Sequence, residues 1–243
     1  MFHKLSLILI LFLTTVPLSL WADDIEPSKS DISISYILED IQGAGSVQVL
    51  IEGQTDWTNA IEGQTLEEGD QIKVGPNTEA VLSLNAETLV HLSQNSQVSI
   101  SQLQTNDSKG FLTHLMLLAG RVLSDVKKNL NATQSSFEIE SGGVVCGVRG
   151  TVFEVEKSGD DVQATTHEGT VETKTSDGVH QVTPGQTCQC HQGAFRGLGP
   201  CGKRALARLA HWKKMRARIL AKCAKRAAQT KNGPIGIRSH GRR

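Results

Sequence analysis

The sequence predicts an all-β fold followed by a single basic helix. Between about Ser33 and Gln186, short runs of alternating apolar and polar residues are separated by Gly, Asn and Pro. Almost no stretch in this range repeats with the 3.6-residue period of a helix, whereas residues 203–230 do. The strand pattern leaves three β architectures open: a sandwich, a roll and a short solenoid of many short strands.

An apolar segment precedes the β pattern. Leu5–Leu20 is almost wholly apolar, follows a weakly basic start and is succeeded by acidic residues from Asp23. This arrangement is typical of an export signal, so we expect residues 1–22 to be a signal peptide cleaved after Ala22. The alternative is an uncleaved anchor in the inner membrane, although the run is short for a bilayer span. We therefore expect a periplasmic or secreted protein.

The β domain is expected to cover residues 23–190. Turn residues such as Gly75-Pro76-Asn77 and Ser176-Asp177-Gly178 separate its strands. The expected strands are Gly45–Ile51, Gln71–Val74, Ala80–Leu84, Thr88–Leu92, Gln97–Leu103, Phe111–Leu118, Gly120–Ser124, Ser136–Glu140, Thr151–Glu156, Asp161–Thr166, Gly169–Thr175 and Gly178–Val182.

Three further segments follow the β domain. Residues 191–202 are rich in glycine and are expected to be a linker. Residues 203–230 are expected to be a basic amphipathic helix, and residues 231–243 a disordered basic end. The expected apolar face of the helix consists of Leu206, Leu209, Ala210, Ala217, Leu220, Cys223, Ala224 and Ala227, with Trp212, Met215 and Ile219 beside it.

The charge is divided along the chain. Residues 23–190 contain 25 acidic and 9 basic residues, and residues 191–243 contain 15 basic residues and no acidic one. Such asymmetry is typical of a tail that binds an anionic surface. That surface is either the protein's own β domain, an anionic membrane or lipopolysaccharide, or nucleic acid, and export makes nucleic acid unlikely.

One motif stands out, Gly147-Val148-Arg149-Gly150-Thr151, in which two glycines bracket a single arginine before a strand resumes. Together with Glu168-Gly169-Thr170-Val171 and the upstream Glu68-Gly69-Asp70-x-Ile72 pattern, it resembles the signature of the FecR domain family. We interpret the motif as a corner of the β domain. Arg149 is interpreted as a brace to neighbouring carbonyls or to Glu168, with a partner contact as the alternative.

The resemblance implies a FecR-like β domain that binds another protein. Well-studied members resemble periplasmic arms of signalling proteins that control a sigma factor through a cytoplasmic part. Only four residues precede the apolar segment, so we do not expect an intrinsic anti-sigma role. We expect a non-enzymatic protein-interaction or envelope-scaffold module that meets another envelope protein. The alternatives are a binder of the envelope surface through the basic tail and an accessory component of transmembrane signalling.

The five cysteines suggest disulfides in an exported protein. Cys146 has apolar neighbours and is expected to be a buried thiol. The disulfide candidates are Cys188, Cys190, Cys201 and Cys223, with one bond fastening the helix to the β domain. The alternative is a metal site made of Cys188, Cys190, His191 and Cys201.

The sequence carries no enzyme signature. His91, His114, His167 and His180 are scattered, and neither a G-x-S-x-G nor an H-E-x-x-H pattern occurs. We therefore expect no catalytic residues and no cofactor. The sequence does not indicate an oligomeric state.

Overall fold

The computed structural model divides the chain into two compact units, Met1–Ile32 and Ser33–Arg243. It describes residues 34–84, 88–105, 111–127 and 136–232, all of which belong to the second unit. The expected signal peptide lies outside the described residues, as does the expected basic end beyond residue 232. In the part of the chain that is described, no helix combines the length and the apolar character that a bilayer crossing requires.

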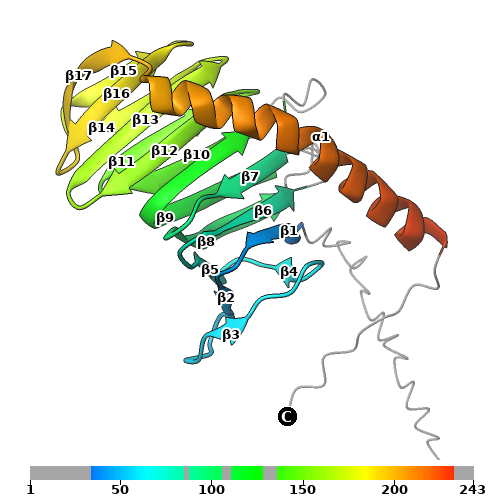
Figure 1. Cartoon of the computed structure of the whole chain (residues 1–243). Coiled ribbons are helices and arrows are strands. Elements are labelled where there is room, and N and C mark those ends of the chain that lie inside the picture. Colours follow the sequence, from blue (N-terminus) through cyan, green and yellow to red (C-terminus); the bar gives the residue numbers. More distant parts are fainter. Residues whose placement is uncertain (1–33, 85–87, 106–110, 128–135, 233–243) are drawn as a thin grey trace, which may run out of the picture. The chain divides into compact units, whose positions relative to one another are not determined.

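Two β-sheets make up most of the second unit, and α1 (Lys203–Asn232) follows them (Figure 1). The strands are β1 (Tyr36–Gly43), β2 (Val47–Leu50), β3 (Thr58–Asn59), β4 (Thr65–Leu66), β5 (Gln71–Val74), β6 (Thr78–Leu84), β7 (Thr88–Leu92), β8 (Gln97–Thr105), β9 (Phe111–Asp125), β10 (Ser136–Ser141), β11 (Val144–Val148), β12 (Val152–Ser158), β13 (Asp161–Glu168), β14 (Val171–Thr175), β15 (Gly178–Val182), β16 (Gln186–His191) and β17 (Ala194–Pro200).

Strand β9 belongs to both sheets. Its first half pairs with β8 and β10, and its second half pairs with β7 and β12. The change occurs at Ala119–Gly120, where Gly120 has a φ of 80°, a conformation that a residue with a side chain rarely adopts. The sequence predicts two strands here because glycine interrupts the pattern; the structure has one strand that passes between the layers.

The strand order in each layer follows from the pairing. The helix-side sheet runs β4-β1-β6-β7-β9-β12-β13-β16-β17, and the motif-side sheet runs β3-β2-β5-β8-β9-β10-β11-β14-β15. Among the described strands, every pair is antiparallel except β9 with β10.

One apolar core lies between the two sheets. Tyr36, Phe137 and Phe153 are among its largest fully buried side chains, and Phe137 and Phe153 meet edge to face at 6.2 Å between ring centroids. Because side chains alternate along each strand, the other face of each sheet is left for other contacts. The all-β prediction is confirmed, and the two layers are closest to the sandwich among the three architectures that the sequence left open.

Several segments differ from what the sequence predicts. Strands β3, β4, β11 and β16 are not among the expected strands, and β16 continues the β structure beyond Gln186, where the pattern was expected to end. The expected linker, residues 191–202, contains β17, which pairs with β16, because these glycines suit the edge of a sheet. Strand β1 is not among the expected strands, because Glu39 and Asp40 interrupt the alternation at its centre. In the structure these two side chains are only 1% and 4% exposed. Consecutive acidic residues rarely lie in a buried strand unless they are paired.

Candidate functional site

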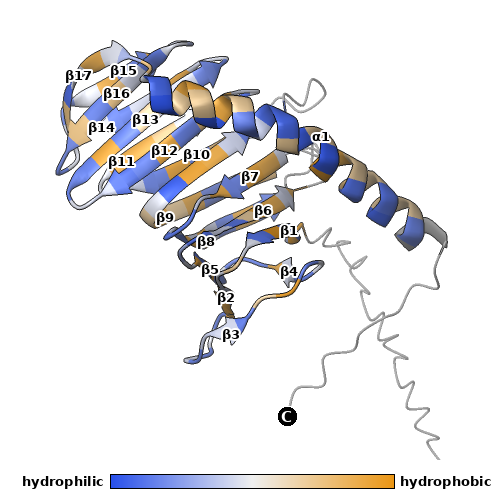
Figure 2. Ribbon diagram, viewed as in Figure 1, coloured by the Kyte–Doolittle hydropathy of each residue, from blue (hydrophilic) through white to orange (hydrophobic). Residues whose placement is uncertain are grey.

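The basic helix lies on the outer face of the helix-side sheet (Figures 1 and 2). Its buried side chains include Trp212, Met215, Ile219 and Cys223. They pack on a patch that four strands contribute, namely Val81 of β6, Leu89 of β7, Leu123 of β9 and Val152 of β12. Burial of each large side chain stabilises the docked helix by about 1.5–3 kcal/mol. This patch is a second, smaller core of the domain.

The docked face of the helix differs from the predicted one. Leu206, which the apolar pattern places on the buried face, is 51% exposed, whereas Trp212 is 1% exposed. The buried face of the helix is therefore rotated towards Trp212, Met215 and Ile219, which the sequence pattern places beside the apolar face. The acidic sheet accounts for this turn, because the helix orientation that buries Trp212 also brings arginine and lysine side chains to buried carboxylates.

Acidic side chains of the sheet pair with the helix along its length. At the first turns, the guanidinium of Arg208 forms a forked contact with Glu154, including Nε to Oε2 at 3.0 Å. In the middle, Arg216 pairs with Asp125. Towards the end, Asp40 and Glu39 receive three cations: Arg218 Nη2 lies 2.7 Å from Asp40 Oδ2, Lys222 contacts the other oxygen of Asp40, and Arg226 pairs with Glu39.

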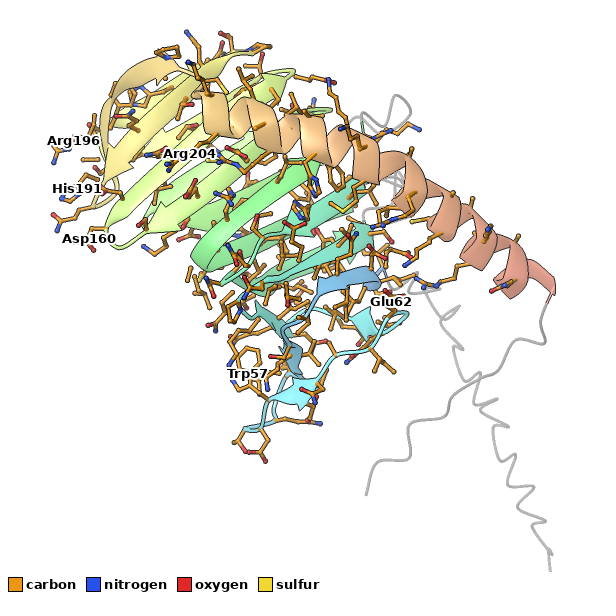
Figure 3. All side chains as sticks on the ribbon, viewed as in Figure 1. Trp57, Glu62, Asp160, His191, Arg196 and Arg204 are labelled. Atoms are coloured by element: carbon orange, nitrogen blue, oxygen red, sulfur yellow. The ribbon has the colours of Figure 1, made fainter. Side chains whose placement is uncertain are left out.

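These pairs explain why the acids can be buried. An isolated carboxylate loses its hydration when it is buried, and a forked hydrogen bond from arginine compensates for much of that loss. Glu62, labelled near the end of the helix in Figure 3, adds a contact to Lys222 Nζ at 3.3 Å. No local pattern indicates these partners, because helix and sheet residues lie up to 187 positions apart.

Glu154 is a strongly perturbed carboxylate of this interface. Burial alone raises its pKa, but the nearby His167, whose Nε2 lies 3.9 Å from Glu154 Oε2, and the hydrogen-bonded guanidinium of Arg208 outweigh burial and lower the pKa to about 2. The side chains of Glu154 and His167 are 3% and 1% exposed. Glu154 is thus a permanent negative charge that holds the first turns of the helix.

The family motif forms the corner between β11 and β12. Gly150 has a φ of 65°, and the Thr151 hydroxyl donates to the carbonyl oxygen of Thr170 at 3.3 Å. Gly169, in the facing turn, has a φ of 82°, and a Cβ there would lie 2.8 Å from Thr151 Oγ1. Glu168, the brace partner suggested for Arg149, forms an ion pair with Lys213 Nζ of the helix at 2.9 Å. Thr151 and the two glycines therefore shape the corner.

A groove of about 510 Å³ crosses the outer face of the motif-side sheet at this corner. It spans β10, β11, β14 and β15 and is lined by Ser136, Glu138, Gly147, Val148, Arg149, Thr170, Glu172, Lys174 and Gln181. Lys174 Nζ lies 3.9 Å from a carboxylate oxygen of both Glu138 and Glu172. These are exposed pairs that stabilise the fold little, so the groove presents both charges to a partner.

Gly147 lies in this groove, and the fold itself does not require a glycine there. It is in the middle of β11 without a positive φ, and a Cβ would meet nothing closer than Glu138 Oε1 at 3.7 Å, an ordinary contact. Glycine inside a strand costs about 0.5–1 kcal/mol relative to alanine. Such a glycine is typical of a place where another main chain approaches closely.

All five cysteines are free thiols. Cys188 and Cys190 face the core between the sheets, whereas Cys223 lies between the helix and the outer face of the helix-side sheet. Cys201 precedes the helix, and the ~30 Å rise from Lys203 to Cys223 separates the two. Because bridged cysteines need Cα atoms within about 7 Å, this arrangement does not favour the expected bond between the helix and the β domain.

The alternative metal site is not assembled in the described structure. His191 follows Cys190 along β16, so it lies on the other face of the strand, where its Nδ1 is 2.8 Å from Asp161 Oδ1. Among the described residues, no group of three or more His, Cys, Asp or Glu side chains is arranged to hold a metal ion.

The chain is similar to a few known proteins. Two solved structures of an anti-sigma factor candidate from Parabacteroides distasonis are similar, each at 16% identity over 56% of this chain, with TM-scores of 0.46 and 0.47. This chain covers 62% of the length of those proteins. A search of curated proteins gave no match. The FecR protein family model matches residues 70–172, which include the Gly147–Thr151 corner and its facing turn, so this part of the chain is similar to the FecR protein family.

Proposed function

We propose that this protein is an exported, non-enzymatic FecR-domain module that binds another protein of the cell envelope through the groove at Gly147. The observation that carries the proposal is the glycine in the middle of β11, which leaves room for a partner's main chain where the fold needs none. The groove crosses four strands and offers Glu138, Lys174 and Glu172 for polar contacts.

The docked helix supports the groove as the binding surface. Trp212, Met215 and Ile219 are buried against the helix-side sheet. A helix that binds membranes uses such a face to enter the headgroup region. Binding of the envelope surface would therefore require the helix to leave the sheet, which breaks its pairs with Glu154 and Asp125.

A site-specific crosslinking experiment tests the proposal. A photoreactive amino acid replaces Gln181, which is exposed in the groove, or Ala221, which is exposed on the helix. Both proteins are produced in the native host with their amino-terminal segment, and envelope fractions are irradiated. We expect a discrete protein adduct from the Gln181 position and none from the Ala221 position, and Gly147→Ala should reduce the adduct.

Four outcomes contradict parts of the proposal. An adduct from the helix position alone indicates that the helix, and not the groove, contacts the partner. The absence of an adduct from either position contradicts the groove as a binding surface. Recovery of the protein in the cytoplasmic fraction refutes export. Sedimentation of the folded chain with vesicles containing anionic lipid or lipopolysaccharide supports the surface-binding alternative, and a Trp212→Ala variant that binds more strongly indicates that the sheet masks the helix.

A further inference from the structure

Two cysteines of β16 lie next to each other in the core. Cys188 and Cys190 are two residues apart, so both side chains point to the same side of the strand. They are 0% and 3% exposed, and their Sγ atoms are 3.7 Å apart. This cluster belongs neither to the groove at Gly147 nor to the interface with the helix.

The strand must bend locally for the sulfurs to bond, because a disulfide also brings the two Cβ atoms to about 3.5–4.5 Å. A disulfide has an S–S distance of about 2.05 Å, so the atoms must approach by roughly 1.7 Å. Residues two apart on a strand have Cα atoms about 6.6 Å apart, which is inside the range for disulfides. The pairing of β16 with β17 shifts register between Gln189 and Cys190, and such bulges increase the local twist.

The neighbouring strand can adjust to that movement. Strand β17 is at the end of the helix-side sheet, and Gly197 is the residue opposite Gln189. Figure 3 labels Arg196 and His191 at this outer end of the sheet. A small change in β16 is therefore passed to an edge strand rather than to the middle of the core.

The other three cysteines are poorly placed to compete. Cys146 faces the same core from β11 of the motif-side sheet, but the backbones of facing sheets are about 10 Å apart, which exceeds the ~7 Å that a disulfide allows between Cα atoms. Cys201 lies just before the helix, and Cys223 lies beyond the opposite face of the sheet. Among the possible disulfides of the five cysteines, the geometry therefore favours the bond between Cys188 and Cys190.

We propose that Cys188 and Cys190 form a redox-convertible dithiol, which a disulfide oxidant closes into a bond within β16. The thiolate of one cysteine attacks a sulfur of the oxidant, forms a mixed disulfide and releases one thiolate. The second cysteine, once deprotonated, attacks the sulfur of the first and releases the other thiolate. Two thiols of the protein are oxidised, and one disulfide is reduced to two thiols.

The hydrogen bond between the thiols assists the first attack. Either sulfur can donate in this pair, and a hydrogen bond from Cys188 lowers the pKa of the Cys190 thiol. Because the thiolate is the reactive form, this donation favours attack by Cys190. Phe195, only half-buried, is its register partner on β17, so the approach of a small oxidant involves the edge strand.

Oxidation of the purified folded protein tests this proposal independently of export and of partner binding. The folded protein is equilibrated with reduced and oxidised glutathione, quenched with acid, alkylated with N-ethylmaleimide under denaturing conditions and weighed by intact mass spectrometry. We expect the number of alkylated thiols to fall from five under reducing conditions to three under oxidising ones. Peptide sequencing should place the bond between positions 188 and 190.

Matched variants identify the pair. Cys188→Val keeps the apolar volume and should leave four thiols free of any internal bond, whereas Cys201→Ala and Cys223→Ala should still lose two thiols on oxidation. Circular dichroism checks that each variant is folded. Five alkylated thiols after oxidation of the folded protein overturn the proposal, and so does a bond that includes Cys146, Cys201 or Cys223.

Discussion

Replacement of Trp212 by alanine is the most direct test of how the helix docks. Trp212 is 1% exposed, stacks on His91 with ring centroids 5.7 Å apart, and donates from Nε1 to Asp125 Oδ2 at 3.3 Å. Removal of a buried tryptophan costs about 3–5 kcal/mol. This loss falls on the contact between the helix and the sheet and not on the core between the sheets, so the helix should leave the sheet before the β domain unfolds.

Leu206→Ala is the matched control on the same helix. Leu206 is 51% exposed, so its loss should change stability by less than about 0.5 kcal/mol. Hydrogen exchange followed by mass spectrometry measures the protection of residues 203–229, and thermal unfolding followed by circular dichroism measures both steps. We expect lost protection of the helix in Trp212→Ala and unchanged protection in Leu206→Ala.

The reasoning is refuted if the two variants behave alike, or if Leu206→Ala is the more damaging one. The second result would mean that the helix buries the apolar face that the sequence pattern predicts, which includes Leu206, and not the face that includes Trp212. A Trp212→Phe variant, which keeps ring packing but not the donor to Asp125, separates the contribution of apolar burial from that of the hydrogen bond.

Three further predictions concern the acidic face and the corner. The pKa of Glu154 is lowered from 4.5 to about 2, so Glu154 contributes ~3 kcal/mol to the free energy of unfolding above pH 4.5, and this contribution is lost as the pH falls to about 2. Urea unfolding measured at a series of pH values should show this loss of stability. An equal loss in the Glu154→Gln variant contradicts the prediction. Asp40→Asn leaves Arg218 and Lys222 without their shared carboxylate, so protease cleavage in the last turns of the helix should become faster, and unchanged cleavage rates count against the pairing. Gly169→Ala must adopt a φ of 82° with its Cβ 2.8 Å from Thr151 Oγ1, so it should lower the free energy of unfolding by more than ~1 kcal/mol, whereas Gly147→Ala should not; equal losses in calorimetry refute this distinction.

The β domain was largely predictable because its signals are local. Alternation over a few residues and turn residues such as Gly75-Pro76 indicate strands and reversals without reference to the rest of the chain. Strands that the pattern does not predict lack such signals. In β1 the pattern is interrupted by Glu39 and Asp40, and β17 holds two glycines and a proline in seven residues.

The candidate binding surfaces were less predictable because they are assembled from distant segments. The motif at Gly147 is visible in the sequence, but its groove also needs Lys174 of β14 and Gln181 of β15. The acid and base division indicated an anionic target for the helix. Whether the β domain could serve as that target depended on whether its acids lie on one face, and only strand register determines that.

Composition and short periodicity were enough to predict the fold class, the position of the helix and the separation of charge, and the residues at Gly147–Thr151 were enough to show a resemblance to the FecR domain family. What the helix faces, which of its sides is buried and which cysteines are neighbours depend on the folded domain. These features could not be obtained locally, because burial of a charge is tolerable only beside its partner. Arg208 and Glu154 are 54 residues apart in the chain, and only the tertiary structure brings them together.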